Sequence, residues 1–141
     1  ESGFLHWGHD ISPEENQYQA GLNFAVNYKK NIDFIGKDAL LKNKDQKFSK
    51  QFIMLSLNNS EPGKPLLLHD EPIYLEDKII GRTTSGNYSF NYKKNISFGY
   101  INSYNSIKDI KNKKLFIEVE KQKYPVNIEL KPLKDKNIKL D

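Results

Sequence analysis

The stretch Leu115-Phe-Ile-Glu-Val-Glu-Lys-Gln-Lys-Tyr-Pro-Val-Asn-Ile-Glu-Leu130 decides the fold. Apolar residues recur at every second position in both of its halves: Leu115, Ile117 and Val119, then Val126, Ile128 and Leu130. A period of two places these side chains on one face of a strand. The stretch therefore predicts two neighbouring strands, 115–120 and 124–130, each with one buried face.

Earlier in the chain, similar short apolar segments predict further strands. They lie at 52–57, 72–75, 79–84 and 96–101. A loop at 58–63 contains Pro62-Gly63, and residues 76–78 join two of the strands as a hairpin. Short strands joined by short turns are typical of a small antiparallel barrel or sandwich. We therefore expect a mainly β (α+β) protein.

The first third of the chain has a different pattern. Leu22, Phe24 and Val26 alternate with other residues and predict a half-buried strand. Residues 37–47 combine apolar residues with Lys, Asp and Gln, which predicts a short amphipathic helix. A boundary is expected near residues 48–50, which gives two parts, 1–48 and 49–141, the second being the antiparallel β-barrel.

Composition excludes several classes of protein. The 141 residues include no Cys, so disulfides, thiolate metal sites and thiol nucleophiles are impossible. No apolar stretch is long enough to span a bilayer and no signal peptide opens the chain, so we expect a cytoplasmic protein without a membrane partner. Since the chain begins at Glu1 rather than Met, within sequence that has an ordered pattern, we expect a fragment of a longer protein.

The net charge of +4 does not favour nucleic-acid binding. Only one of the 22 basic residues, Arg82, is an Arg. Proteins that recognise bases and phosphates usually depend on the bidentate contacts of Arg. The scattered Lys residues are better explained as a solvated surface.

Several motifs occur in a fixed order. They are Glu1–Ile11, which contains His6-Trp-Gly-His-Asp10, then Gln19–Leu22, Asp33–Leu40, Glu71–Ile73, Gly81–Gly86 and Gly99-Tyr100. This ordered set resembles the glycine-cleavage T-protein (aminomethyltransferase) family. The His-Trp-Gly-His-Asp and Gly-Arg-Thr-Thr-Ser-Gly segments look most like its dimethylglycine and sarcosine dehydrogenase branch.

The resemblance implies a fold and a function. In that family three subdomains surround a tetrahydrofolate site; residues 1–48 would be the end of the folate-binding domain and 49–141 the C-terminal barrel. The complete enzyme would transfer a one-carbon unit to tetrahydrofolate from an amine donor: a glycine-derived aminomethyl group, dimethylglycine or sarcosine. The family's catalytic Asp would lie upstream, so we expect no catalytic residue and no activity in this chain alone. Its partners would be the missing N-terminal part and the small-molecule donor. In the dehydrogenase branch, FAD would bind outside this chain.

Four residues are candidates for contact with folate. By resemblance, Glu1 falls at the position that holds the pterin ring, where a carboxylate can accept from adjacent N–H groups. Lys30 either corresponds, by resemblance, to an Arg that faces the folate glutamyl carboxylate or, as we slightly prefer, is one more surface Lys. Trp7 is either a stacking partner or, as we prefer, a core or interface anchor. Arg82 is either an anion clamp or a support for the contact with the folate-binding part.

Other interpretations are kept beside these. His6, His9 and Asp10 have a spacing that could bind a metal, but we expect hydrogen bonding by His9 and Asp10 instead and no metal site. Thr83, Thr84 and Ser85 are expected to be strand residues with local hydrogen bonds. A non-catalytic folate-binding or interaction module is the alternative function. A methyl-transferring relative that acts on a sulfonium substrate is a third.

Overall fold

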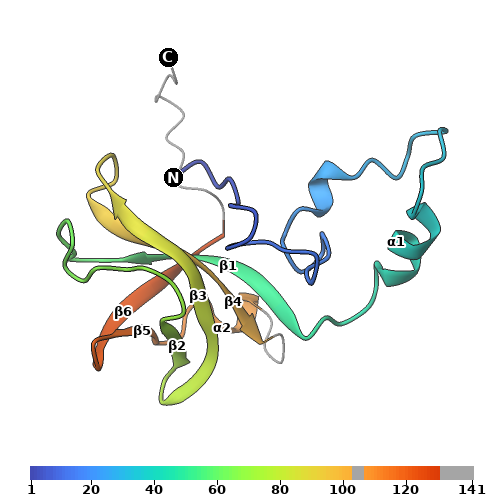
Figure 1. Cartoon of the computed structure of the whole chain (residues 1–141). Helices are drawn as coiled ribbons and strands as arrows, with labels where there is room; N and C mark the ends of the chain where they lie inside the picture. Colours follow the sequence, from blue (N-terminus) through green and yellow to red (C-terminus); the bar gives the residue numbers. More distant parts are fainter. Residues whose placement is uncertain (103–106, 131–141) are drawn as a thin grey trace.

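The computed structural model describes residues 1–102 and 107–130. Within this part, antiparallel strands close into a barrel in the order β1-β4-β3-β2-β5-β6 (Figure 1). The strands are β1 Lys50–Leu57, β2 Pro72–Leu75, β3 Lys78–Ser89, β4 Lys94–Asn102, β5 Leu115–Val119 and β6 Gln122–Glu129. The predicted mainly β fold with an antiparallel barrel is confirmed.

Alternate side chains of these strands fill the barrel. Its core contains Ile53, Leu55, Leu57, Leu67, Ile73, Ile80, Ile101, Leu115, Ile117, Val126 and Ile128. The short helix α2, Ile107–Ile110, adds Ile110, which is fully buried. Each such side chain contributes about 1.5–3 kcal/mol relative to an exposed one. The inward position predicted for Leu130 is wrong, since this residue follows the end of β6 and is 56% exposed.

A tight turn sets the register of the β5–β6 hairpin. Between β5 and β6, Glu120 and Lys121 have φ of 50° and 64°, and Val119 pairs with Gln122. Two consecutive positive φ values fit the right-handed twist of a two-residue hairpin. Strand β3 continues beyond the predicted 79–84 because its polar second half, up to Ser89, still pairs with β4.

Residues 1–49 form an arm outside the barrel (Figure 1). The strand predicted around Leu22–Val26 is wrong: residues Asn23–Ala25 form the short 3-10 helix η1, and Phe24 is 85% exposed. The amides of Ala25 and Val26 bond locally to the carbonyls of Leu22 and Asn23, at 3.0 and 3.2 Å. Alternation alone predicted a strand, but a strand needs a partner to satisfy its backbone.

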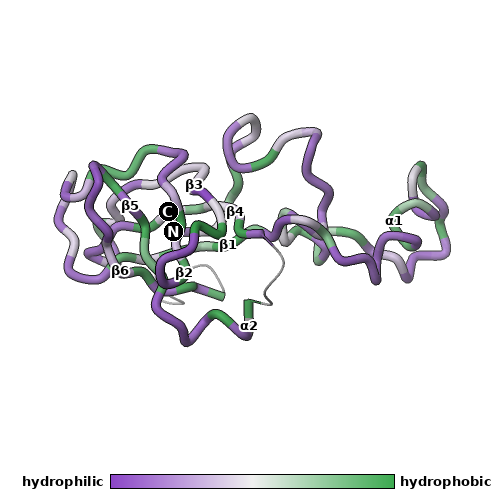
Figure 2. Tube along the Cα trace, turned by 90° about the horizontal axis from the view of Figure 1, so that it is seen from below, coloured by the Kyte–Doolittle hydropathy of each residue, from purple (hydrophilic) through white to green (hydrophobic). Residues whose placement is uncertain are grey.

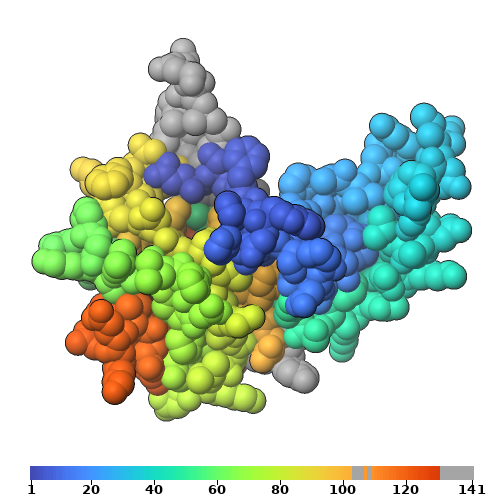
Figure 3. Space-filling model, in the orientation of Figure 1, coloured from blue at the N-terminus to red at the C-terminus, as the bar shows by residue number. Residues whose placement is uncertain are grey.

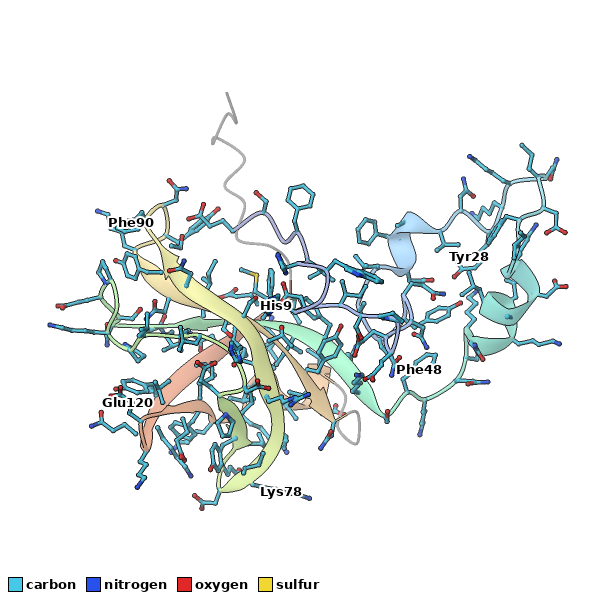
Figure 4. All side chains as sticks on the ribbon, in the orientation of Figure 1. His9, Tyr28, Phe48, Lys78, Phe90 and Glu120 are labelled. Atoms are coloured by element: carbon cyan, nitrogen blue, oxygen red, sulfur yellow. The ribbon has the colours of Figure 1, made fainter. Side chains whose placement is uncertain are left out.

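The predicted helix is present but shorter, as α1 spans Lys37–Asn43. The Tyr18 hydroxyl donates to the Leu40 carbonyl at 2.8 Å, and the Tyr18 ring stacks on Phe48 with centroids 5.5 Å apart. Tyr28 lies near α1, far from the barrel, and Phe48 lies between α1 and the start of β1 (Figure 4). Apolar segments of the arm are visible far from the barrel in Figure 2. In the described part of the chain, no helix has the length and hydropathy needed to cross a membrane.

Candidate functional site

The candidate site is the junction between the arm and the outer face of the barrel. The N-terminal segment lies across the strands in the space-filling view (Figure 3), and His9 lies at this junction (Figure 4). The Phe52 amide of β1 donates to the Gln19 carbonyl at 2.8 Å, and Ala20 beside it is 2% exposed. The Phe52 ring packs on Phe98 and Tyr100 of β4, with centroids 5.1 and 5.5 Å away.

Asp10 is the buried polar centre of the junction. Its side chain accepts hydrogen bonds from the Thr84 and Ser85 hydroxyls at 2.6 and 2.7 Å and from the His6 amide at 2.9 Å. Its backbone carbonyl accepts from the Tyr100 hydroxyl at 2.9 Å. The residue is 2% exposed. The hydrogen bonding expected of Asp10 is thus present, but three of its four donors, Thr84, Ser85 and Tyr100, are distant in sequence.

A β-bulge explains how two consecutive residues reach one carboxylate. In the β3–β4 pairing Thr83 faces Gly99 and Ser85 faces Phe98, so Thr84 is an extra residue. Neighbouring side chains of a regular strand point to opposite faces, whereas a bulge changes the direction of one of them. The bulge at Thr84 therefore brings both hydroxyls to the face that Asp10 occupies.

Glu1 borders a shallow hollow on the same face. The hollow has a volume of about 190 Å³ and lies between Glu1 and the β3 and β4 segments 85–87 and 96–98. The Glu1 carboxylate accepts from the Ser89 hydroxyl at 2.5 Å and from Asn91 Nδ2 at 2.6 Å. The Ser89 hydrogen bond, then the Asn91 one, lower the pKa of Glu1 below its ordinary value. At neutral pH this group is an ionised acceptor.

A larger groove of about 590 Å³ separates the arm from the edge of the barrel, with Gly8 and His9 on one side and Gly81 and Arg82 on the other. Arg82 Nη1 lies 3.0 Å from Asp70 Oδ1, with both side chains mostly exposed. A hydrogen bond from His69, then the charge of Arg82, lower the pKa of Asp70. An exposed pair of this kind contributes little stability.

A second ion pair also lines this groove. Lys50 bonds to Glu15, whose side chain is 8% exposed, and the Lys50 ammonium lies 5.1 Å from the Tyr100 ring centroid. Burial opposes ionisation of Glu15, but hydrogen bonds from Lys50 and Ser12 outweigh it and lower its pKa. Burial, with the nearby charges of Glu15 and Asp10, raises the pKa of Tyr100, which therefore keeps its proton as a donor.

The four predicted folate contacts do not meet in one place within the described residues. Glu1 borders the hollow and Arg82 borders the groove. Trp7, 66% exposed, lines neither. Lys30 is exposed in the distal arm, where its carbonyl accepts from Lys37 Nζ at 3.5 Å. These four roles remain predictions.

The two histidines of the first motif pack on each other. The His6 and His9 ring centroids are 4.8 Å apart. Among residues 1–102 and 107–130, no group of three or more His, Cys, Asp or Glu side chains is arranged to hold a metal ion. Beside this ring contact, the His9 backbone amide donates to the His6 carbonyl at 3.2 Å.

Sequence reasoning missed that Asp10, Thr84 and Ser85 form one unit. Asp10 and Thr84 are 74 positions apart, and the sequence between them carries no local signal of this contact. Both ends lie in motifs noted above, His6–Asp10 and Gly81–Gly86, but only folding shows that they touch. The structure also buries Glu71, whose carboxylate accepts from Thr83 and, at 2.6 Å, from the Leu68 amide.

Comparison with known proteins now defines the class. Residues 50–135 match the family model described as the glycine cleavage T-protein C-terminal barrel domain. The chain belongs to this family, and the closed barrel of β1–β6 is the domain concerned.

The relatives with similar sequences are named for different activities. The chain is 39% identical over 97 residues to an aminomethyltransferase of Listeria welshimeri, covering 69% of this chain and 26% of that protein. It is 32% identical over 101 residues to mouse mitochondrial dimethylglycine dehydrogenase, covering 72% and 11%. It is 40% identical over 88 residues to a formaldehyde-forming 4-methylaminobutanoate oxidase of Paenarthrobacter nicotinovorans, covering 62% and 10%.

A solved structure shows the same fold. The aminomethyltransferase T of the Bartonella henselae glycine cleavage system superposes with a TM-score of 0.72 at 21% identity, covering 90% of this chain and 34% of that one. The chain thus spans between about a tenth and a third of the proteins compared.

Proposed function

We propose that this chain is the C-terminal part of a longer, tetrahydrofolate-dependent enzyme of the aminomethyltransferase type. The enzyme transfers a one-carbon unit to tetrahydrofolate from a glycine-derived aminomethyl group, dimethylglycine or sarcosine. The observation that carries the proposal is the family membership of the barrel, together with relatives that are several times longer. A cytoplasmic location belongs to the same proposal.

The arm supports a division into two parts, 1–48 and 49–141. In 1–48 only Asp10, Gln19 and Ala20 are buried, while Phe4, Trp7, Phe24, Ile32 and Ile35 are exposed. Helix α1 has seven residues, none of them buried, and isolated helices of this length are marginal in water. Large exposed apolar surfaces mark interaction sites. The preceding part of the same enzyme is the partner that we assign to this surface.

This chain's own residues bind and orient rather than react. Tetrahydrofolate supplies the nitrogen nucleophile, and the catalytic Asp belongs to the missing part. The ionised Glu1 has acceptor capacity beyond its two present hydrogen bonds, which fits the N–H groups of a pterin. Trp7 offers an aromatic face, and Lys30 and Arg82 offer charge to carboxylates. In a dehydrogenase-type enzyme FAD would bind outside this chain.

The test is turnover by the full-length protein. With tetrahydrofolate and each donor, we expect 5,10-methylenetetrahydrofolate, and no product from residues 1–141 alone. Tetrahydrofolate binding without turnover of any donor would favour the non-catalytic folate-binding module instead. Failure of the full-length protein to bind tetrahydrofolate would refute both.

A further inference from the structure

Asp10 is the most deeply buried of the ties between residues 1–18 and the barrel, which also include the Glu15–Lys50 ion pair. Of residues 1–18, only Asp10 is buried. Its carboxylate and carbonyl together accept four hydrogen bonds, three of them from barrel side chains: Thr84, Ser85 and Tyr100. Removing this side chain would therefore remove the hydrogen bonds from Thr84 and Ser85 while leaving the strand ladders of the barrel intact.

The hydrogen-bond partners of the Asp10 carboxylate indicate that it holds the loop in position and does not take part in chemistry. The groups that hydrogen-bond to the Asp10 carboxylate are neutral: two hydroxyls and one amide. A buried carboxylate needs all of its donors, because each lost donor leaves charge uncompensated in an apolar environment. The Asp10 carboxylate therefore favours the one arrangement of the loop in which all three donors reach it.

We propose that Asp10 is a positioning residue: its carboxylate, held by the bulge at Thr84, fixes the loop that carries Trp7 and His9 and orients the start of the chain, with Glu1, on the barrel. For its effect on folate this inference rests on the proposed function.

The experiment uses the full-length protein and three variants. Asp10→Ala removes the acceptor; Thr84→Val removes one hydroxyl with little change in shape; Thr84→Ser keeps the hydroxyl and is the matched control. Hydrogen exchange of the amides of residues 6–12 is measured beside that of β1 and β4, together with the dissociation constant for tetrahydrofolate.

We expect exchange of residues 6–12 to rise about ten-fold or more in Asp10→Ala and about three-fold or more in Thr84→Val, with β1 and β4 unchanged. Thr84→Ser should match the wild type. Tetrahydrofolate affinity should fall about ten-fold in Asp10→Ala, in step with the loop.

The outcomes test the positioning role of Asp10 and the proposed folate site separately. Unchanged exchange of residues 6–12 in Asp10→Ala would overturn the positioning role. A faster loop with unchanged tetrahydrofolate affinity would leave the positioning role standing and refute the folate site on this segment. If Asp10→Ala does not fold, the comparison of Thr84→Val with Thr84→Ser tests both points, through the hydrogen exchange of residues 6–12 and the affinity for tetrahydrofolate.

Discussion

Gly81 on β3 lies so close to Tyr100 on β4 that a Cβ atom added to it would be 2.0 Å from the Tyr100 carbonyl oxygen. The same atom would be 2.8 Å from the Cα of Ile101. Both neighbours are backbone, so a side chain could not displace them without separating the strands. The first residue of the Gly81–Gly86 motif is therefore explained by strand packing rather than by ligand binding.

Gly81→Ala should lower the free energy of unfolding by about 3 kcal/mol or more, because it forces apart the two strands. Urea denaturation monitored by circular dichroism measures the change. Gly63→Ala is the control: Gly63 has φ of 71° with open space around it, so only its backbone conformation should cost about 1 kcal/mol. Equal losses in the two variants would contradict the steric explanation.

Glu15 should contribute stability that depends on pH. Its pKa in the folded chain lies below its ordinary value of 4.5, so the stability it adds is fully present above that value and is lost as the pH falls through the folded pKa. Glu15→Gln should therefore be less stable than the wild type at pH 7. The two unfolding free energies should converge as the pH is lowered toward 3.

Unfolding measured at several pH values tests this convergence. Asp45→Asn, at an exposed position of the arm, is the control for the change of one charge, and its free energy of unfolding at pH 7 should lie within about 0.5 kcal/mol of the wild type. A constant gap between wild type and Glu15→Gln across the range would show that Glu15 acts through shape rather than charge.

Glu1 should matter for folate if the proposed site is correct. In the full-length protein, Glu1→Ala should weaken tetrahydrofolate binding about ten-fold or more, through loss of a charge-assisted bidentate contact. Calorimetry measures the affinity. Glu1→Gln keeps the shape of the side chain and one acceptor oxygen. Its affinity for tetrahydrofolate should therefore lie between those of the wild type and Glu1→Ala. An affinity that stays at the wild-type value in Glu1→Ala would remove this residue from the site.

The exposed apolar side chains of the arm should contribute to stability only in the full-length protein. Phe24 is 85% and Ile35 is 105% exposed, so Phe24→Ser and Ile35→Ser should each change the stability of residues 1–141 by less than about 0.5 kcal/mol. In the full-length protein each should cost about 2 kcal/mol, since the preceding part would bury these side chains.

Lys42→Ser, on the exposed side of α1, is the matched control for both proteins. Thermal unfolding of each variant and of the wild type, in residues 1–141 and in the full-length protein, measures the loss of stability in the two contexts. Losses no larger in the full-length protein than in residues 1–141 would mean that the arm faces solvent there as well.

The alternation of apolar and polar residues predicted most strands of the barrel, because it depends only on neighbouring residues. A strand with one buried face alternates, so β5 and β6 followed from residues 115–130, and β2 was predicted with its observed ends. The same rule failed at Phe24, since alternation cannot show whether a partner strand is present. It also underestimated β3, whose polar second half is held by pairing with β4 rather than by apolar side chains.

The sequence by itself determined the class of fold, the family resemblance and the order of the motifs, because these depend on residue type and spacing. Only the tertiary structure decided that Asp10 meets Thr84 and Ser85, that Glu1 binds the β3–β4 hairpin, and that Trp7 and Lys30 lie outside both cavities. Contacts between residues more than seventy positions apart are set by barrel closure and by a one-residue bulge, and neither has a local signature in the chain.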